Sequence, residues 1–209
     1  MADTLHESST RELLLEATSR RLWKVDESEL RILDICKETN LSTSVIYAHF
    51  GSRQGLIDAA LLRVFTTVAD GMIETLSAAV AGPHPTGSFI DTLNEILSDP
   101  AGESDISARR QMFFRVSATA LSRPSLRVRF LTLYGEFMTR IDSLYDELVR
   151  QELLDSDLSG HQWALFFEGQ MLSRAFHDLS SKRDDQEDWI RTTKRLILST
   201  TRDQVPAPD

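Results

Sequence analysis

The sequence of 209 residues lacks, or contains few of, the residues and motifs that several other classes of protein require. Its one cysteine, Cys36, permits neither an intramolecular disulfide nor an all-cysteine metal site, and we interpret it as a small buried hydrophobe rather than a redox sensor. No stretch approaches the ~20 consecutive apolar residues of a membrane span. The polar first dozen residues also lack the apolar segment of a signal peptide. We therefore expect a soluble, cytoplasmic protein that does not contact a membrane.

Motifs for catalysis are also missing. The sequence has no glycine-rich loop that would cradle phosphate, no nucleophile elbow and no HExxH or paired CxxC pattern. The five histidines show no ligand-like spacing with one another or with Cys36. We predict no catalytic residues, no metal site, no cofactor and no enzymatic activity.

Basic side chains are in the minority. Lys and Arg total 23 against 32 for Asp and Glu, which gives a formal net charge of −9. This balance argues against a chain that is basic throughout, the simplest signature of nucleic-acid binding. Residues 1–55 hold 7 basic and 9 acidic side chains, so only −2 of the total lies there and −7 belongs to residues 56–209.

Glycine and proline are scarce as well, at 9 and 6 residues, and they fall between stretches where apolar residues recur at helical spacing. Ser9 with Glu12 has the pattern of a capping box, Ser52 suits the start of a long helix, and Pro124 suits the first turn of the longest one. We predict an all-α protein of about nine helices. The expected helices cover roughly residues 9–22, 29–38, 42–50, 52–80, 89–97, 104–121, 124–153, 160–180 and 185–201.

Residues 28–56 have the pattern of a helix-turn-helix. A first short helix is followed by Thr39-Asn40-Leu41 as a tight turn, and Ser42 would cap the second helix. Asparagine suits this turn because it tolerates the left-handed backbone conformation. Two short helices joined in this way are typical of a motif that places its second helix in the major groove of DNA.

The same segment resembles the TetR family of bacterial transcriptional regulators. The resemblance rests on Asn40-Leu41-Ser42 and above all on the run Ile46-Tyr47-Ala48-His49-Phe50, followed by Ser52-Arg53 and Leu56. The family has a turn glycine where this chain has Asn40. It has a lysine where this chain has Arg53, which keeps the positive charge.

The resemblance implies an N-terminal three-helix DNA-binding domain at residues 1–55 and a helical ligand-binding and dimerisation domain at 56–203, followed by a disordered tail at 204–209. It also implies that double-stranded operator DNA is a partner. Thr43, Ser44 and Tyr47 would face the major groove, and Arg53 would contact the DNA backbone. The candidate DNA-binding residues are Arg31, Ser42, Thr43, Ser44, Tyr47, His49 and Arg53.

These candidates also have structural interpretations. Tyr47 is alternatively a packing residue, His49 a structural hydrogen-bonding group, and Ser42 only a helix cap. The expected helix 42–50 has no Lys or Arg, so an arginine–guanine contact is not available from it and phosphate binding should be weak. The alternative function is therefore a helical ligand-binding or scaffold protein that keeps this fold but binds DNA weakly or not at all.

Large apolar residues on the later helices are the candidates for an effector site. The resemblance implies that these helices surround a cavity for a small organic effector, although any single aromatic residue there can simply belong to the core. Glu168 would need a partner if buried, such as a ligand cation, Arg110 or Arg115, and would need none if it faced solvent. The candidate ligand-binding residues are Met112, Phe113, Phe130, Tyr134, Phe137, Phe167, Glu168 and Met171.

The expected helix at 160–180 is apolar on two sides. One side can pack in the core and the other on a second subunit, so we predict a homodimer through the last two helices. A palindromic operator also requires such a dimer. The two stripes are Leu165, Gly169, Leu172, Phe176 and Leu179 on one side, and Trp163, Phe167 and Met171 on the other. The resulting hypothesis is a ligand-responsive regulator, usually a repressor in this family.

Overall fold

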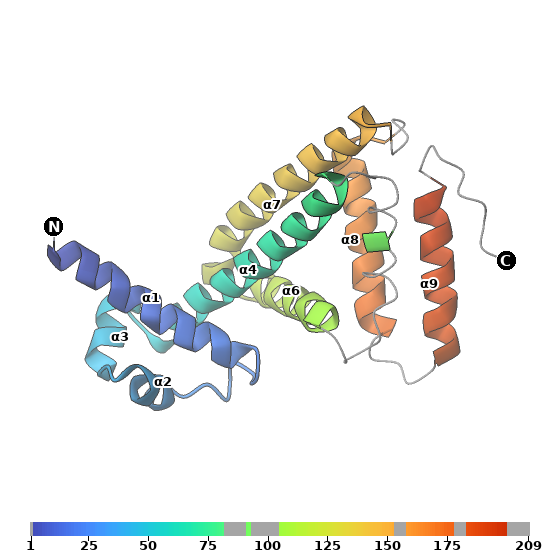
Figure 1. Cartoon of the computed structure of the whole chain (residues 1–209). Coiled ribbons are helices and arrows are strands. Elements are labelled where there is room, and N and C mark those ends of the chain that lie inside the picture. The colour runs from blue at the N-terminus through green and yellow to red at the C-terminus, as the bar shows by residue number, and fades with distance from the viewer. Residues whose placement is uncertain (1, 82–90, 93–104, 153–157, 178–182, 200–209) are drawn as a thin grey trace. The chain divides into compact units, whose positions relative to one another are not determined.

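The computed structural model describes residues 2–81, 91–92, 105–152, 158–177 and 183–199 (Figure 1). Within these ranges the regular structure is entirely helical, and the predicted all-α class is confirmed. The helix expected at 89–97 lies outside the described residues except for 91–92, which are helical, and so does the expected tail at 204–209. The helices are α1 (Ala2–Leu22), α2 (Ile32–Thr39), α3 (Thr43–Phe50), α4 (Arg53–Ala81), α6 (Asp105–Ser122), α7 (Pro124–Arg150), α8 (Gly160–His177) and α9 (Arg183–Leu198).

Two of the predicted helix starts are confirmed and one is wrong. The Ser52 hydroxyl accepts the Gly55 N–H at 2.9 Å and caps α4, and Pro124 is the first residue of α7. The first helix begins at Ala2 and not at Ser9, because the residues between them include neither proline nor glycine to stop it. Glu12, expected in a capping box, instead pairs with Arg63.

The chain forms two compact units, each made of two separated segments. Unit 1 consists of Met1–Thr67 and Arg115–Leu133, and unit 2 consists of Val68–Phe114 and Tyr134–Asp209. The chain passes from one unit to the other inside α4, α6 and α7, so each of these helices contributes residues to both units. The domain boundaries expected from the sequence, after residues 55 and 203, stay predictions.

Unit 1 has a core of aliphatic side chains from its first four helices. Leu14, Ile35, Ile46 and Leu56 are fully buried, one from each of α1 to α4. Complete burial of such a side chain contributes about 1.5–3 kcal/mol to folding. Helix α1 lies against α2, and α2 lies against α3. This packing holds the two short helices in place although neither is long enough to be stable alone.

In unit 2, α8 and α9 run side by side (Figure 1). The indole of Trp163 is stacked on the Phe167 ring with centroids 5.3 Å apart, and the Trp189 indole N–H donates to the Ser173 hydroxyl at 3.0 Å. The two predicted stripes of α8 differ in burial as expected. Trp163, Phe167 and Met171 are buried, while Leu165, Gly169, Leu172 and Phe176 are exposed.

None of the helices in the described part of the chain is both long and apolar enough to cross a lipid bilayer. The described residues also contain no group of three or more His, Cys, Asp or Glu side chains arranged to hold a metal ion.

Candidate functional site: a helix-turn-helix and an apolar cavity

The turn between α2 and α3 is closed by a left-handed residue. Asn40 ends α2 with φ 55° and ψ 33°, and the Leu41 N–H donates to the Cys36 carbonyl at 3.2 Å. This bond is the six-to-one bond of a Schellman motif, which ends a helix and redirects the chain sharply. The prediction for Asn40 is confirmed. Cys36 itself is half-buried, not fully buried as expected.

The N-terminus of α3 is not capped as predicted. Ser42 occupies the N-cap position with extended backbone angles, φ −84° and ψ 160°, but its side chain caps no backbone N–H. The Ser42 and Ser44 hydroxyl oxygens instead lie 2.7 Å apart, because the second residue of the helix offers a nearby polar partner. Two exposed hydroxyls therefore stand at the start of this helix.

The outward face of α3 is polar but uncharged. The Tyr47 side chain is 48% exposed, Ser44 is exposed and Thr43 is half-buried, while Ile46 on the opposite face is fully buried. Thr43 and Ser44 lie on the same side of the helix as Tyr47, because residues three or four positions apart are neighbours on a helix surface. Tyr47 is thus a surface residue and not part of the core. His49 is half-buried, with its ring centroid 6.2 Å from that of Phe50.

Several arginines of unit 1 bind the protein's own backbone carbonyls. The Arg53 guanidinium donates to the Leu30 carbonyl at 2.8 Å and the Glu27 carbonyl at 2.6 Å. Arg115 donates to the carbonyl of Leu22 at 2.9 Å and that of Val25 at 3.1 Å. Both arginines therefore brace the connection between α1 and α2. Contact of Arg53 with DNA stays a prediction.

Other arginines of this unit pair with carboxylates. Glu38 accepts from Arg20 at 2.9 Å and from Arg21 at 2.8 Å. Burial opposes ionisation of Glu38, but the hydrogen bonds from both arginines outweigh it and hold its pKa below the ordinary value. The backbone N–H and hydroxyl of Ser28 lower the pKa of Asp26 in the same way, by hydrogen bonding to its carboxylate.

A buried carboxylate ties three separate segments of unit 1 together. Asp58 of α4 is only 7% exposed, and its two oxygens accept from Arg123 at 2.6 Å and from the Ser125 hydroxyl at 3.0 Å. Arg123 also pairs with Glu27 of the α1–α2 connection. The start of α7 and the residue before it are thus joined to α4 and to the segment that precedes the helix-turn-helix.

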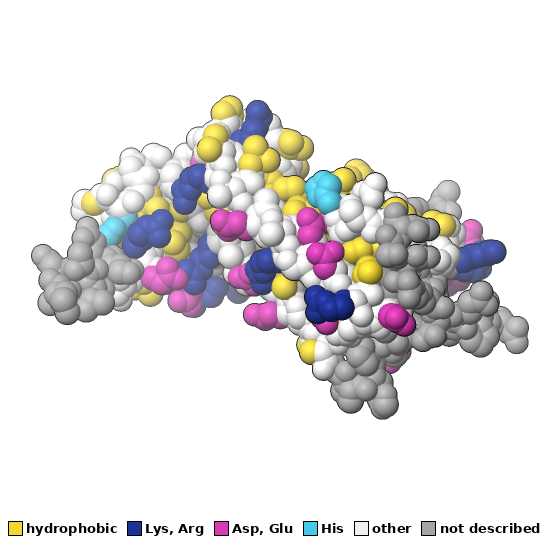
Figure 2. All heavy atoms as spheres, turned by 90° about the horizontal axis from the view of Figure 1, so that it is seen from above, with side chains coloured by type: hydrophobic (Ala, Val, Ile, Leu, Met, Phe, Trp, Pro, Cys, Tyr) yellow, Lys and Arg dark blue, Asp and Glu magenta, His cyan; other side chains and the backbone are white. Residues whose placement is uncertain are grey.

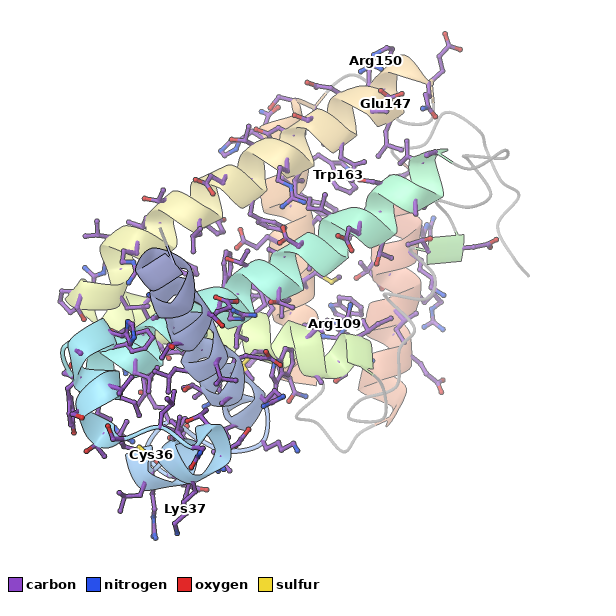
Figure 3. All side chains as sticks on the ribbon, turned by 60° about the vertical axis from the view of Figure 1, so that its left-hand side comes forward. Cys36, Lys37, Arg109, Glu147, Arg150 and Trp163 are labelled. Carbon is purple, nitrogen blue, oxygen red and sulfur yellow. The ribbon has the colours of Figure 1, made fainter. Side chains whose placement is uncertain are left out.

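Two cationic side chains of the helix-turn-helix bind neither a carbonyl nor a carboxylate of the described residues. Arg31 precedes α2, and Lys37 lies in its last turn and points outward from the helix (Figure 3). Both are exposed, and neither side chain forms a hydrogen bond or an ion pair with the residues that the structure describes. A third cation, the Arg11 guanidinium, lies 5.3 Å from the centroid of the Phe50 ring. On the face shown in Figure 2, acidic and basic side chains are interspersed.

Unit 2 contains a partly open cavity of about 240 Å³ between α4, α6, α7 and α8. Most of its wall is aromatic or aliphatic, and its charged side chains are Arg109, Arg110 and Glu168. Arg110 is buried, and Arg109 of α6 (Figure 3) is accommodated by Gly71, where a Cβ atom would lie 3.1 Å from the guanidinium. Five of the predicted ligand-binding residues line the cavity, namely Phe113, Phe137, Phe167, Glu168 and Met171.

The other three predicted residues do not line the cavity. The Tyr134 hydroxyl donates to Glu168 Oε2 at 2.7 Å and so supports the wall from behind. Burial and the neighbouring carboxylate raise the pKa of Tyr134 well above its ordinary value. Met112 is buried elsewhere. Phe130 lies in unit 1 with its ring edge-on to Phe65, the centroids being 4.9 Å apart.

Part of the wall was not expected from the sequence. Val68, Gly71, Met72 and Thr75 of α4 line the cavity, and so does Arg109. The spacing of the α4 residues, at three, four and seven positions, was a signal for one helix face. The spacing alone does not show whether this face of α4 lines a cavity or packs in a filled core.

Comparison with known proteins agrees with this architecture. No family model matches the chain. The HTH-type transcriptional regulator BetI of Escherichia coli is 23% identical over 171 residues, which cover 81% of this chain and 84% of that protein. A TetR-family regulator from Pectobacterium atrosepticum superposes with a TM-score of 0.66 at 15% identity, covering 95% of this chain and 97% of that one.

The chain has the TetR-family fold. A second TetR-fold neighbour, a transcriptional regulator from Saccharomonospora viridis in complex with choline, has a TM-score of 0.66 at 16% identity. The superposition covers 94% of this chain and 100% of that one. The similar proteins named here are described as transcriptional regulators.

Proposed function

We propose that this protein is a ligand-responsive transcriptional regulator, acting as a repressor, that binds a palindromic operator as a homodimer. The observation that carries the proposal is the outward face of α3, which presents Ser44 and Tyr47 beyond a closed helix-turn-helix in a TetR fold. A helix held in this way enters the major groove of DNA. Such a protein would work in the cytoplasm, where the DNA is.

Base recognition would rely on hydroxyl groups. Thr43, Ser44 and Tyr47 can donate to or accept from base edges, and methyl groups can contact thymine. Arg31 and Lys37 would bind phosphates, because both are exposed and form no ion pair among the described residues. Ser42, His49 and Arg53 complete the proposed DNA-binding set.

A gel-shift or fluorescence-anisotropy measurement on the DNA upstream of the protein's own gene tests this proposal. The parent protein should shift a palindromic fragment, and Tyr47→Ala should weaken binding at least tenfold while leaving the unfolding transition unchanged. Leu13→Ala, at an exposed apolar position on α1, is the matched control and should bind as the parent does. Absence of a sequence-specific shift at low salt would refute the proposal.

The dimer would form through the exposed stripe of α8 together with α9. Phe176 is 66% exposed, Leu165 and Leu172 are exposed, and Gly169 leaves open space above the helix. Exposed apolar side chains in one row are typical of an isologous interface. Leu172→Arg should shift the sedimentation coefficient to that of a monomer, whereas Leu33→Arg on α2 should not.

The effector would bind in the cavity of unit 2, with Phe113, Phe137, Phe167, Glu168 and Met171 in contact and Tyr134 behind Glu168. The complex of the Saccharomonospora viridis neighbour with choline supports a small organic molecule as ligand. Such a ligand lowers operator affinity only as far as it binds the DNA-free state more tightly.

A second candidate function is a helical ligand-binding protein that binds DNA weakly or not at all. It is favoured by the internal commitment of Arg20, Arg21 and Arg53, which leaves few cations for phosphate. The two functions differ in one measurement. The regulator binds its operator with sequence specificity at about 100 mM salt, whereas the alternative binds DNA weakly and without sequence preference, or not at all.

A further inference from the structure

Helix α3 lacks the side chains that form two hydrogen bonds to a single base. Its residues, Thr43 to Phe50, include no Arg, Lys, Asn, Gln, Asp or Glu. In the major groove of DNA, guanine is recognised chiefly by the paired donors of Arg or Lys, adenine by the amide of Asn or Gln, and cytosine by a carboxylate. None of these contacts is available from α3, so its recognition of bases must depend on other groups.

The outward face of α3 offers apolar groups instead. Ser44, Tyr47 and Ala48 are exposed, and they are neighbours on the helix surface because they lie three and four positions apart. Thr43, one turn before Tyr47, is half-buried on the same side. The methyl groups of Thr43 and Ala48 and the ring of Tyr47 are of the kind that contacts the C5 methyl group of thymine.

The hydroxyl groups of this face discriminate poorly between bases. A hydroxyl can both donate and accept, so it pairs with either kind of base edge. The Ser42 and Ser44 hydroxyl oxygens also lie 2.7 Å apart, so one of them already donates to the other. Hydroxyl groups would therefore add affinity for DNA, while discrimination between bases would depend on the apolar groups.

Neighbouring aromatic and cationic side chains do not add a base-reading group to this face. His49 and Phe50 are half-buried and lie three and four positions after the fully buried Ile46, so they belong to the inward side of α3. The Arg11 guanidinium lies 5.3 Å from the centroid of the Phe50 ring. The Arg53 guanidinium is bound to two backbone carbonyls of its own unit.

We infer that α3 recognises its operator through the C5 methyl groups of thymines and makes no contact with guanine N7 or O6. This inference rests on the proposed function, because it requires α3 to enter the major groove of DNA. Each operator half-site should present thymines to Thr43, Tyr47 and Ala48. Burial of one methyl group is worth about fourfold in affinity, so one such contact in each half-site of a palindrome gives about 15-fold.

Fluorescence anisotropy with modified operators tests this inference. The probe is the operator that the parent protein selects from a random DNA pool, synthesised with deoxyuridine in place of thymidine in both half-sites. This replacement removes only the C5 methyl groups, and the affinity should fall by about tenfold or more. The same replacement outside the half-sites is the matched control and should change the affinity less than about twofold.

A second modified operator tests the exclusion of guanine. 7-Deazaguanine in place of guanine in the half-sites removes the N7 acceptor, and the affinity should change less than about twofold. Three results would overturn the inference. They are half-sites without thymine, a loss below about threefold with deoxyuridine, and a loss of about tenfold with 7-deazaguanine.

Thr43→Ser assigns the effect to a methyl group of the protein, because it keeps the hydroxyl and removes the methyl. Binding to the thymidine operator should weaken about tenfold, whereas binding to the deoxyuridine operator should change less than about twofold. Thr66→Ser, at a half-buried position on α4, is the matched control and should bind both operators as the parent does. Equal losses on the two operators in Thr43→Ser would contradict the assignment.

Tyr47→Phe keeps the experiment decisive if Thr43→Ser folds poorly. This variant retains the ring and loses the hydroxyl, so its preference for the thymidine operator over the deoxyuridine operator should stay at about tenfold. Loss of that preference would show that the Tyr47 hydroxyl reads the base and would overturn the inference.

The outcomes for this inference and for the proposed function are distinguishable. If the parent selects no operator at low salt, the proposed function fails and recognition by α3 fails with it. If an operator is selected but thymidine and deoxyuridine forms bind equally, the regulator stands and recognition through thymine methyl groups is wrong.

Discussion

Unit 1 and unit 2 differ in where their charged side chains lie. In unit 1, Arg53, Arg115 and Arg123 are bound to carbonyls or carboxylates that belong to the same unit. In unit 2, Glu168 lies in a cavity wall with only a neutral phenol as its described partner. The unit expected to bind a polyanion thus uses much of its positive charge internally, while the unit expected to bind a small molecule brings two guanidinium groups, of Arg109 and Arg110, and one carboxylate, of Glu168, to its cavity wall.

This difference shows why charge counts alone do not identify a binding surface. The seven basic side chains of residues 1–55 include at least three, Arg20, Arg21 and Arg53, that hold the fold together. The cations available to bind DNA are those that do not already bind carbonyls or carboxylates of the protein itself.

The largest expected effect concerns the close packing of unit 1 at Gly55. A Cβ atom there would overlap the Phe50 carbonyl oxygen at the end of α3. Gly55→Ala should therefore lower the free energy of unfolding by about 3 kcal/mol, measured by urea denaturation. Gly135→Ala in unit 2, where an added Cβ would meet no atom of another element within 4 Å, should raise it by about 0.5–1 kcal/mol. Effects of the same sign would remove this contrast between the units.

The salt dependence of DNA binding measures how few cations unit 1 offers. Arg53 is left out of the count of phosphate cations, because its guanidinium is bound to two backbone carbonyls. Arg31 and Lys37 from each subunit then give about four phosphate contacts and a slope of roughly −3.6 in log affinity against log salt. Affinity should fall about 100-fold between 50 and 200 mM salt. Lys37→Ala should reduce the slope by about two, one contact per subunit. A parent slope near −8 would show that arginines now bound internally reach the DNA.

The next effect concerns the buried network around Asp58. Arg123→Met leaves the Asp58 carboxylate without its cation, so the free energy of unfolding should fall by about 2 kcal/mol. The matched control is Arg150→Met, which removes the pairing of Arg150 with Glu147 at the end of α7 (Figure 3). The Arg150 side chain is 68% exposed, so its loss should leave the free energy of unfolding nearly unchanged. Equal losses in the two variants would contradict the structural role of Arg123.

The smallest expected effect is a pH dependence at Glu38. Its pKa is lowered in the folded protein, so its pairing with Arg20 and Arg21 stabilises the fold above the unfolded pKa, about 4.3. That contribution is lost as the pH falls through the folded pKa. In acid titrations followed by circular dichroism, Glu38→Gln should lose a few tenths of a kcal/mol less than the parent. The matched control is Glu29→Gln, which removes an exposed carboxylate of the same unit.

The elements that depend on local chemistry could be predicted from the sequence. Asn40 turns the chain because its backbone tolerates φ 55°, and Ser52 caps α4 because its hydroxyl reaches an N–H three residues ahead. Both outcomes involve neighbours within a few residues. The first helix was the exception, since Ser9 and Glu12 fit a capping pattern but nothing before them stops the helix.

The partners of long side chains could not be predicted in the same way. Arg53 binds the carbonyl of Glu27, 26 residues away, and Arg123 binds Asp58, 65 residues away. Such contacts follow from how helices pack and not from local spacing. Phe130 illustrates the same limit, because one position on α7 faces Phe65 in unit 1 while Phe137, two turns later, faces the cavity.

Because α4, α6 and α7 each belong to both units, they limit how a chimera can be made from this chain and another protein. Domains that are exchanged by a single splice are usually joined by an exposed linker that few contacts cross. Here the chain changes unit three times, after residues 67, 114 and 133, and each change falls within a helix. A chimera that exchanges unit 1 for that of another protein must therefore include residues 115–133 as well as residues 1–67. A simple N-terminal graft would separate Arg123 from Asp58 and Glu27, its partners in the graft.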